Sequence, residues 1–188
     1  GGWSTSLIGH GKGNQVEAFK ESFFAHSLGS FYEAATEFCG FKANYDEGKT
    51  MGLAPFGDAG AYYDQVKDMI RVDESGGLRV DLSWFDYQHW GHRRCGPRFE
   101  SVFGAARRPT GAFEKNHVDV AAAFQRVLEE CGLRMARHLY ERTREKHLVI
   151  AGGVSLNSVM NGRILRETPF EDVYVMAAAG DNGTSIGA

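Results

Sequence analysis

Residues 147–165, HLVIAGGVSLNSVMNGRIL, predict a buried strand, a glycine turn and a helix in direct succession. Leu148 to Ala151 form a short apolar run rich in β-branched residues, of the kind that fills a buried parallel strand. Gly152 and Gly153 interrupt this run. Apolar residues then recur at helical spacing up to about Glu167, namely Leu156, Val159, Met160 and Ile164.

A second strand and a second glycine turn follow. The apolar run Val173 to Met176 leads into the turn GDNG at residues 180–183, and a further helix begins at Thr184. The connection between the two runs is about twenty residues long, which suffices for a βαβ unit, and such crossovers are right-handed in about 98% of cases. Both glycine turns are therefore expected at the same edge of a parallel sheet.

This edge is the part of the sequence that most suggests a ligand site. Ligands of open α/β sheets bind beyond the carboxyl ends of the strands, where helix N-termini present unpaired N–H groups. Glycines there let the backbone approach a nucleotide without a Cβ clash. Asp181, the one carboxylate in the second turn, is suited to a metal or a metal-bound phosphate. The alternative is that both are ordinary tight turns, with Asp181 capping the last helix.

Composition excludes several classes of protein. The 188 residues suggest one domain, with a subdivision into two lobes near residue 115 as an alternative. A formal net charge of −3 gives no general affinity for nucleic acid. No apolar run reaches the roughly eighteen residues that mark a membrane span. Neither nucleic acid nor membrane is therefore an expected partner.

The cysteines and the chain ends point to a piece of a reduced, intracellular protein. Cys39, Cys95 and Cys131 are odd in number and form no CxxC pair, which favours a cytoplasmic location over a disulfide framework. The chain starts at Gly1 without methionine and stops where a helix is only beginning. We therefore expect the chain to be cut at both ends.

The remaining chain predicts a hairpin and two further helices. Alternation of polar and apolar residues indicates strands at Trp3–Ile8 and Val16–Lys20. Ser27 is the expected cap of a helix that ends before Gly40, a residue suited to the left-handed position after a helix. The longest helix is expected to open at Asn116 and run to about Lys146, with Asp119 at its third position.

Between these helices the sequence is less regular. Residues 45–57, YDEGKTMGLAPFG, show neither helical nor strand periodicity, and irregular segments of this kind commonly line sites. In this segment Lys49 is a natural point charge for a phosphate, with Glu47 as its partner, and the alternative is a solvated surface pair. Residues 62–72 predict a short helix, and residues 78–85 predict a strand.

A basic segment surrounds the second cysteine. Residues 89–98, HWGHRRCGPR, place three arginines and two histidines around Cys95. Neighbouring cations predict a lowered thiol pKa and make Cys95 the most reactive cysteine, whereas a solvated basic loop is the alternative. His89 and His92 alone are too few for a closed metal site.

Three segments together resemble the nodulation-type and antibiotic-pathway O-carbamoyltransferase family. They are TSLIGHGKGN with HSLGSFYEAATEFCGFKANYDEGKTMGLAPFG, then LVIAGGVSLNSVMNGRIL, and then GDNGTSIGA. The combination of EGKTMGLAPFG with AGGVSLN is far more specific than either glycine motif alone. The resemblance implies a partial carbamoyl-transfer domain over residues 1–188, of the actin, sugar kinase and heat-shock ATPase superfamily. The implied fold is α/β and ribonuclease H-like, a mixed sheet with flanking helices.

The resemblance also implies a reaction. In this family carbamoyl phosphate reacts with ATP to give carbamoyl-adenylate, and the carbamoyl group then passes to a hydroxyl of a sugar or natural product. Carbamoyl phosphate and a hydroxyl-bearing small molecule are therefore the expected partners, together with the N- and C-terminal parts of the same protein. Family members take metal-binding histidines from the N-terminal part, so the piece alone is expected to be inactive. A homodimer is compatible with the sequence.

Several residues carry roles through the resemblance. Asp181 corresponds to a ligand of a divalent metal of the iron or magnesium class. Lys49 is suited to neutralise a phosphate. His26 is the preferred candidate for the base that activates the acceptor hydroxyl, with His10 as the second choice. The implied nucleotide site comprises Gly152, Gly153, Asn157, Gly180 and Gly183.

Two other functions stay open on the sequence alone. A sugar kinase of the same superfamily would consume ATP without carbamoyl phosphate. A regulatory module without turnover would bind nucleotide but not consume it. The nucleotide product formed by the full-length protein separates the three hypotheses.

Overall fold

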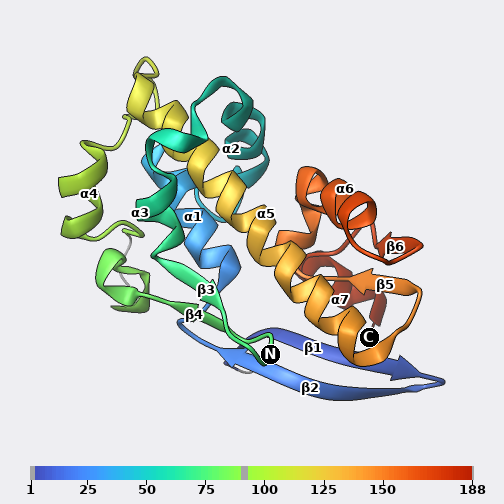
Figure 1. The fold of residues 1–188 in the computed structure, drawn as a ribbon. Helices are drawn as coiled ribbons and strands as arrows, with labels where there is room; N and C mark the ends of the chain where they lie inside the picture. The colour runs from blue at the N-terminus through green and yellow to red at the C-terminus, as the bar shows by residue number, and fades with distance from the viewer. Residues whose placement is uncertain (1–2, 90–92, 188) are drawn as a thin grey trace.

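One long helix, α5 (Lys115–Thr143), forms the axis of the molecule (Figure 1). The structure is a computed structural model that describes residues 3–89 and 93–187. The other helices are α1 (Leu28–Phe38), α2 (Glu47–Leu53), α3 (Tyr63–Lys67), α4 (Pro97–Phe103), α6 (Ser158–Glu167) and α7 (Thr184–Gly187). Short 3-10 turns join them: η1 (Ala54–Phe56), η2 (Ala59–Ala61), η3 (Leu82–Trp84), η4 (Tyr87–His89), η5 (Gly153–Leu156) and η6 (Asp181–Gly183).

The strands of the described residues form three separate two-stranded sheets. Two are antiparallel: β1 (Ser4–Lys12) with β2 (Gln15–Phe23), and β3 (Ile70–Val72) with β4 (Leu78–Val80). The third, β5 (His147–Ile150) with β6 (Asp172–Val175), is parallel. The α/β class is confirmed, but these residues alone do not form the expected single mixed sheet. The ribonuclease H-like core stays a prediction.

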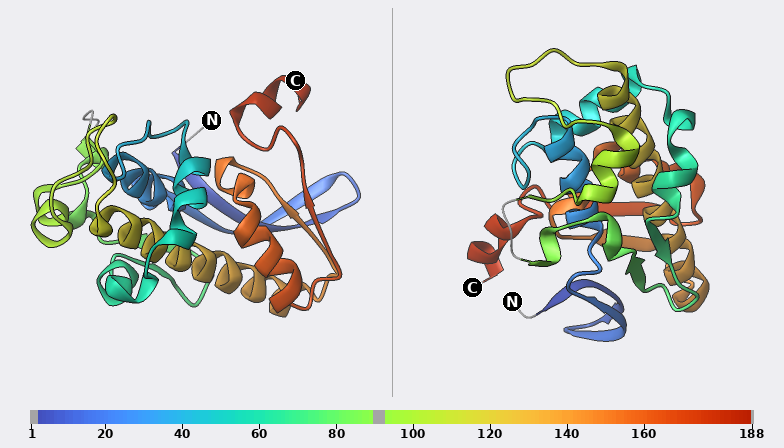
Figure 2. Two further views of the ribbon diagram at one scale, coloured as in Figure 1. Left: turned by 90° about the horizontal axis from the view of Figure 1, so that it is seen from above. Right: turned by 90° about the vertical axis from the view of Figure 1, so that its left-hand side faces the viewer.

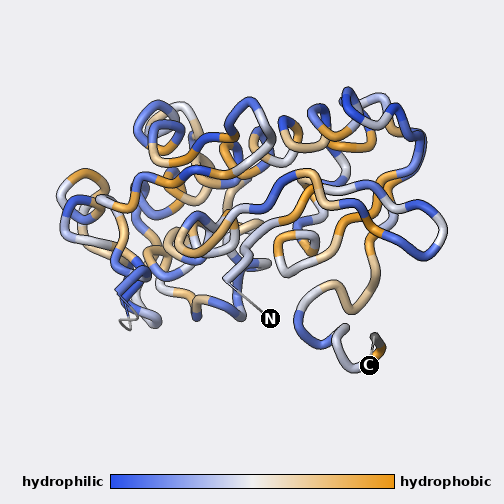
Figure 3. The backbone as a smooth tube through the Cα atoms, turned by 90° about the horizontal axis from the view of Figure 1, so that it is seen from below, coloured by the Kyte–Doolittle hydropathy of each residue, from blue (hydrophilic) through white to orange (hydrophobic). Residues whose placement is uncertain are grey.

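The core is aromatic and lies between α1, α4 and α5. Phe31 of α1 stacks on Phe124 of α5, with ring centroids 4.5 Å apart, and Phe99 of α4 lies 5.7 Å from Phe124. All three rings are fully buried. Apolar and polar residues alternate along the helical segments (Figure 3), as expected for helices with one apolar face each. The aromatic core therefore fixes α5, which leads through residues 144–146 into β5.

The second half of α5 supports the parallel sheet. Helix α6 packs along α5 and contacts β6, and the two views of Figure 1 and Figure 2 agree on this arrangement. Leu148 of β5 and Ile164 of α6 are both buried in the common core. The predicted strand, turn, helix and strand of residues 147–176 are confirmed, with β6 ending at Val175. The prediction that the first strand is buried throughout was wrong, because Leu148 is buried but Val149 is exposed.

The predicted hairpin and first helix are confirmed. The hairpin strands extend further than expected, to Lys12 and Phe23. The Ser27 Oγ accepts a hydrogen bond from the Ser30 N–H (3.1 Å), which makes Ser27 the cap of α1. Gly40 adopts φ +75°, and a Cβ there would lie 2.6 Å from the Arg107 carbonyl oxygen. Both backbone angle and packing therefore require glycine at this position.

The start of the long helix differs from the prediction. Glu114 is the cap, two residues before the expected opening at Asn116, and its side chain forms a capping box with His117. Asp119 does not cap the helix, although its Oδ2 pairs with Lys115, the first residue of α5 (2.5 Å). Its carboxylate accepts a hydrogen bond from the Asp58 N–H (2.8 Å) and thereby anchors the η2 turn to α5. The Asp119 carboxylate, which the sequence placed near the start of the helix, therefore makes a tertiary contact with the η2 turn.

The segment of residues 45–57 is helical, and the prediction of an irregular segment was wrong. Helix α2 and turn η1 occupy most of it. The Thr50 hydroxyl donates to the Thr36 hydroxyl (2.9 Å), and both side chains are fully buried between α2 and α1. Because only one turn of the helix faces the core, the segment is too short to show a helical period.

The middle of the chain contains shorter elements than predicted. The helix expected over residues 62–72 is limited to α3 and is followed by β3. The strand expected over residues 78–85 stops at Val80, because Asp81 Oδ1 accepts from the Ser83 N–H (3.1 Å) and caps the η3 turn. Leu78 and Val80 are both buried, as predicted for one face.

Candidate functional site

The structure brings the two glycine turns together at one end of the parallel sheet. β5 and β6 pair in register, with Val149 opposite Tyr174. Just beyond the strands, the Gly152 N–H donates to the Ala179 carbonyl oxygen (2.8 Å). The expectation that both turns lie at the same edge is therefore confirmed, and the edge is held by a backbone hydrogen bond between the turns.

The two glycines of the first turn differ in what the fold requires of them. Gly152 has φ +94°, a conformation that residues with a side chain rarely adopt. Gly153 has no such angle, and a Cβ there would meet no atom of the described residues within 4 Å. Both residues are exposed. Folding therefore explains the glycine at position 152, whereas no contact or backbone angle within the described residues requires glycine at position 153.

The second turn contains one packing glycine and one unpaired carboxylate. A Cβ on Gly183 would lie 2.2 Å from the Ala178 carbonyl oxygen, so the fold itself requires this glycine. A Cβ on Gly180 would make only ordinary contact, at 3.6 Å from the Asn182 Oδ1. The exposed Asp181 carboxylate has no hydrogen bond or ion pair within residues 3–89 and 93–187. It therefore does not cap the last helix, and it is available to a ligand.

The described residues do not form a metal centre by themselves. No three histidine, cysteine, aspartate or glutamate side chains in the described part of the chain are placed to hold one ion. Asp181 supplies a single carboxylate, and divalent metals need several ligands. A metal ion at Asp181 would require further ligands that the described residues do not place beside it.

Asn157 is buried and belongs to a polar network beneath the first turn. Its Oδ1 accepts from the Met160 N–H (3.0 Å), which caps α6. Its amide also pairs with the amide of Gln125 on α5: Gln125 Nε2 donates to Asn157 Oδ1 (3.0 Å), and Asn157 Nδ2 donates to Gln125 Oε1 (2.9 Å). Because Asn157 is only 8% exposed, it does not line the open edge. Its hydrogen bonds position the turn and the helix instead.

The network continues through the interface between the helices. The Tyr32 hydroxyl on α1 donates to Gln125 Oε1 (2.6 Å), and burial raises the pKa of this tyrosine. Gln125 Nε2 also donates to Glu129 Oε1 (2.7 Å), and Arg163 of α6 pairs with the other oxygen of Glu129 (2.9 Å). These hydrogen bonds tie α1, α5 and α6 together directly below the glycine edge.

The sequence analysis missed this network, although a signal was present. Gln125 and Glu129 are four residues apart, so they share one face of α5, and that face is otherwise apolar. Polar residues on the buried side of a helix need hydrogen-bond partners. A search for polar residues within the apolar stripe would therefore have found both residues, but not their partners on other helices.

His26 is bound to another part of the fold. Its Nδ1 accepts a hydrogen bond from the Val80 N–H (3.1 Å), next to β4. A neutral imidazole has one acceptor nitrogen, and this contact occupies it. The structure therefore gives His26 a structural contact and no hydrogen bond to either glycine turn within the described residues. His10 is likewise engaged, by Glu145 (2.9 Å).

Lys49 is exposed on α2 and is paired with a different carboxylate than expected. Its ammonium group lies 2.8 Å from Asp46 Oδ1, and the hydrogen bond from Lys49 is the main cause that lowers the pKa of Asp46. Glu47 instead accepts a hydrogen bond from the Asn44 N–H (2.6 Å). The predicted pair of Glu47 with Lys49 was wrong: Lys49 forms an exposed pair with Asp46 instead.

Cys95 is buried, and the prediction of a reactive thiol was wrong. Its sulfur donates to the Ala34 carbonyl oxygen (3.3 Å), and burial raises the pKa of this thiol. The nearby carboxylates of Glu37 and Glu100 raise it further, against the smaller opposing effect of Arg93. The predicted His89 is exposed, and His92 lies outside the described residues.

We expect all three thiols in this region to react slowly in the native protein. Cys39 and Cys131 are also buried, and burial raises the pKa of each to about 12. At pH 8, a maleimide should modify these residues only after denaturation, because the thiolate is the nucleophile. Mass spectrometry of peptides after native and denatured labelling measures this. Fast native labelling of Cys95 would restore the idea of a reactive cysteine.

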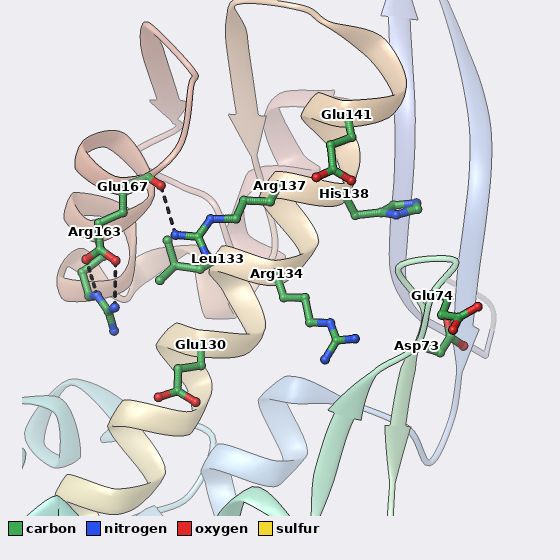
Figure 4. Close-up of a pocket in the computed structure, with 10 residues that line it drawn as sticks. All are labelled: Asp73, Glu74, Glu130, Leu133, Arg134, Arg137, His138, Glu141, Arg163 and Glu167. Atoms are coloured by element: carbon green, nitrogen blue, oxygen red, sulfur yellow. Dashed lines mark hydrogen bonds and ion pairs between the residues drawn. The ribbon is translucent and has the colours of Figure 1, made fainter.

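One hollow on the described surface lies away from the glycine turns. It has a volume of about 580 Å³ and opens between α5, α6 and the turn that joins β3 to β4 (Figure 4). Its charges are mixed, and the arginines at its α6 side are engaged: Arg163 by Glu167 (2.6 Å), and Arg137 by the Glu167 carbonyl oxygen (3.1 Å). The hollow is therefore less suited to a polyphosphate than the glycine edge.

Comparison with known proteins places the chain in a family. The family described as "Carbamoyltransferase N-terminus" matches residues 1–188. The uncharacterized protein sll1178 of Synechocystis is 40% identical over 190 residues, which cover 100% of this chain and 31% of that protein. Nodulation protein NolNO of Sinorhizobium fredii is 32% identical over 188 residues, covering 100% of this chain and 26% of that protein.

A further relative agrees with this assignment. Nodulation protein NolO of Bradyrhizobium diazoefficiens is 34% identical over 189 residues, covering 100% of this chain and 32% of its own length. The chain thus spans about a third or less of the length of these relatives. The resemblance on which the sequence analysis relied is confirmed: the chain belongs to the carbamoyltransferase N-terminus family.

Proposed function

We propose that this chain is part of an ATP-dependent O-carbamoyltransferase. Carbamoyl phosphate, ATP and water give carbamoyl-adenylate, with release of phosphate and pyrophosphate. The carbamoyl group then passes to a hydroxyl of a small-molecule acceptor such as a sugar, with release of AMP. Family membership over all 188 residues supports the carbamoyltransferase assignment. The proposal also includes the use of ATP and carbamoyl phosphate, the adenylate intermediate and an actin-like ATPase fold.

The observation that carries the nucleotide site is the open space beside Gly153. Two backbone turns meet there through the Gly152 to Ala179 hydrogen bond, and the position of a Gly153 side chain is free of described atoms. A phosphate or ribose can therefore approach the main chain closely. The unpaired Asp181 carboxylate lies in the adjoining turn. Gly180 and Gly183 shape that turn.

The proposed role of this part of the protein is mainly to position the adenylate relative to the acceptor hydroxyl. Carbamoyl-adenylate is an activated mixed anhydride, so holding it in line with the acceptor hydroxyl supplies much of the rate. The first N–H groups of a helical turn lack partners within the turn, so those of Gly153 and Val154 can donate to a bound phosphate. The Asn157 and Gln125 pair holds this turn in place. Because the Nδ1 of His26 already accepts a hydrogen bond from the Val80 N–H, we propose no base for the hydroxyl among these residues.

The product of ATP consumption tests the proposal. Full-length protein is incubated with ATP, carbamoyl phosphate and a mixed pool of sugars, and nucleotides are separated by chromatography. We expect AMP, formed only when carbamoyl phosphate is present. Formation of ADP without carbamoyl phosphate would indicate a sugar kinase instead, and nucleotide binding without turnover would indicate a regulatory module.

The setting of the reaction is also inferred. The three cysteines of this region are free thiols in the structure. Unpaired thiols are typical of reducing compartments, which supports a cytoplasmic location for the enzyme.

A further inference from the structure

The parallel sheet has one face that no described element covers, where the apolar Val149 and Tyr174 lie beside the polar pair of His147 and Asp172. Val149 and Tyr174 are directly opposite each other on β5 and β6, so their side chains share one face. They are 70% and 62% exposed, respectively. The neighbours Leu148 and Val173 point to the other face and pack in the core with α5 and α6. The sheet is therefore covered on one side only.

Such an arrangement is unusual for a parallel sheet. Parallel sheets occur almost only with both faces covered, and their strands are accordingly apolar on both sides. The exposed pair here consists of a β-branched and an aromatic residue, the types that favour buried strands. The described residues also add no third strand, so the outer edges of β5 and β6 have unpaired backbone groups. Both features indicate a missing neighbour.

The size of the face bears on the identity of that neighbour. Two side chains offer far less than the roughly 1,200 Å² of total buried surface that a specific, stable dimer needs. A segment of the same polypeptide requires less, because the covalent link raises its effective concentration to about the millimolar range. Such a segment is available in the relatives, where this region makes up 31%, 26% and 32% of the chain.

We propose that a segment of the same polypeptide outside residues 1–188 packs across Val149 and Tyr174 and completes the parallel sheet. This inference is independent of the reaction that the protein catalyses, because it rests on exposure, pairing and chain length alone. It predicts that Val149 and Tyr174 are buried in every folded full-length molecule, with or without nucleotide.

Cysteine accessibility in the full-length protein tests the proposal. Tyr174→Cys is compared with Tyr45→Cys, a matched control, since Tyr45 is 72% exposed and lies before α2. The native thiols of this region are buried, and labelling of the unsubstituted protein gives the background. Maleimide is applied without nucleotide, and labelling of each site is followed by peptide mass spectrometry. We expect Tyr174→Cys to react about tenfold more slowly than Tyr45→Cys in the native protein, and equally fast after denaturation.

Two further arms keep the result decisive. Val149→Cys is expected to show the same protection as Tyr174→Cys, so an altered fold in one variant does not remove the test. The labelling is repeated over a dilution series, and intramolecular protection is expected to be independent of concentration. Equal labelling of Tyr174→Cys and Tyr45→Cys in both folded variants would overturn the proposal. Protection that disappears on dilution would overturn it as well, because the cover would then be a second copy.

Discussion

Replacing Gly153 with valine should lower kcat/KM for carbamoyl transfer by about a hundredfold or more, because a side chain there displaces the nucleotide from its reactive position. The fold should tolerate the change, since no described atom lies within 4 Å of the new Cβ and the residue is exposed. Carbamoyl-dependent release of AMP by the full-length protein measures the rate, and thermal unfolding measures the stability.

A second glycine provides the matched control. A Cβ on Gly11 of β1 would also meet nothing within 4 Å, and valine suits an exposed strand. Gly11→Val should therefore leave both activity and unfolding temperature close to those of the unsubstituted protein. If Gly153→Val retained full activity as Gly11→Val does, the glycine edge would be a structural turn and not the nucleotide site.

Replacing Asn157 with alanine should destabilise α6 by about 2–4 kcal/mol. The change removes the cap of the helix, which is worth about 1 kcal/mol, and it removes two of the four hydrogen bonds of the buried Gln125 amide, which costs about 1–3 kcal/mol. Hydrogen exchange of the α6 amides in the full-length protein measures the local free energy of opening.

Two companion variants separate the two roles of Asn157. Asn157→Ser retains a capping oxygen, so about 1 kcal/mol of the loss should be recovered relative to alanine. The double change of Asn157→Ala with Gln125→Leu should cost less than the sum of the single changes, because the two side chains are coupled. Unchanged exchange of α6 in Asn157→Ala would show that the network does not hold the turn.

The local sequence pattern predicted the elements that are long or whose ends are marked by a capping residue or a glycine. The hairpin, the Ser27 cap, the Gly40 terminus and the strand, turn and helix of residues 147–167 each depend on neighbours in sequence. Helix α5 was predicted for the same reason, although its start at Glu114 was not. Short elements such as α2 escaped prediction, because Thr50 reveals its buried side only through a partner on α1.

The candidate site divides in the same way. The meeting of the two glycine turns followed from the order of strands and the direction of a βαβ crossover, and it is confirmed. The environment of single side chains did not follow. Cys95 lies among basic residues in sequence but against Ala34 and near Glu37 in space, so its pKa rises instead of falling. His26 and Lys49 are likewise defined by partners that no local pattern identifies.

The expected mixed sheet would need further strands beside β5 or β6, and a metal at Asp181 would need further ligands. The uncovered face of Val149 and Tyr174 is consistent with both, because it indicates where the rest of the polypeptide attaches.

The central claim is that the nucleotide binds where the two glycine turns meet. Hydrogen exchange of the full-length protein with and without ATP tests it most directly. The account predicts that ATP slows exchange of backbone amides in both residues 152–157 and residues 180–184, while the control segment β1 to β2 is unchanged. Bound ATP that leaves both turns unprotected and slows exchange elsewhere would contradict the account.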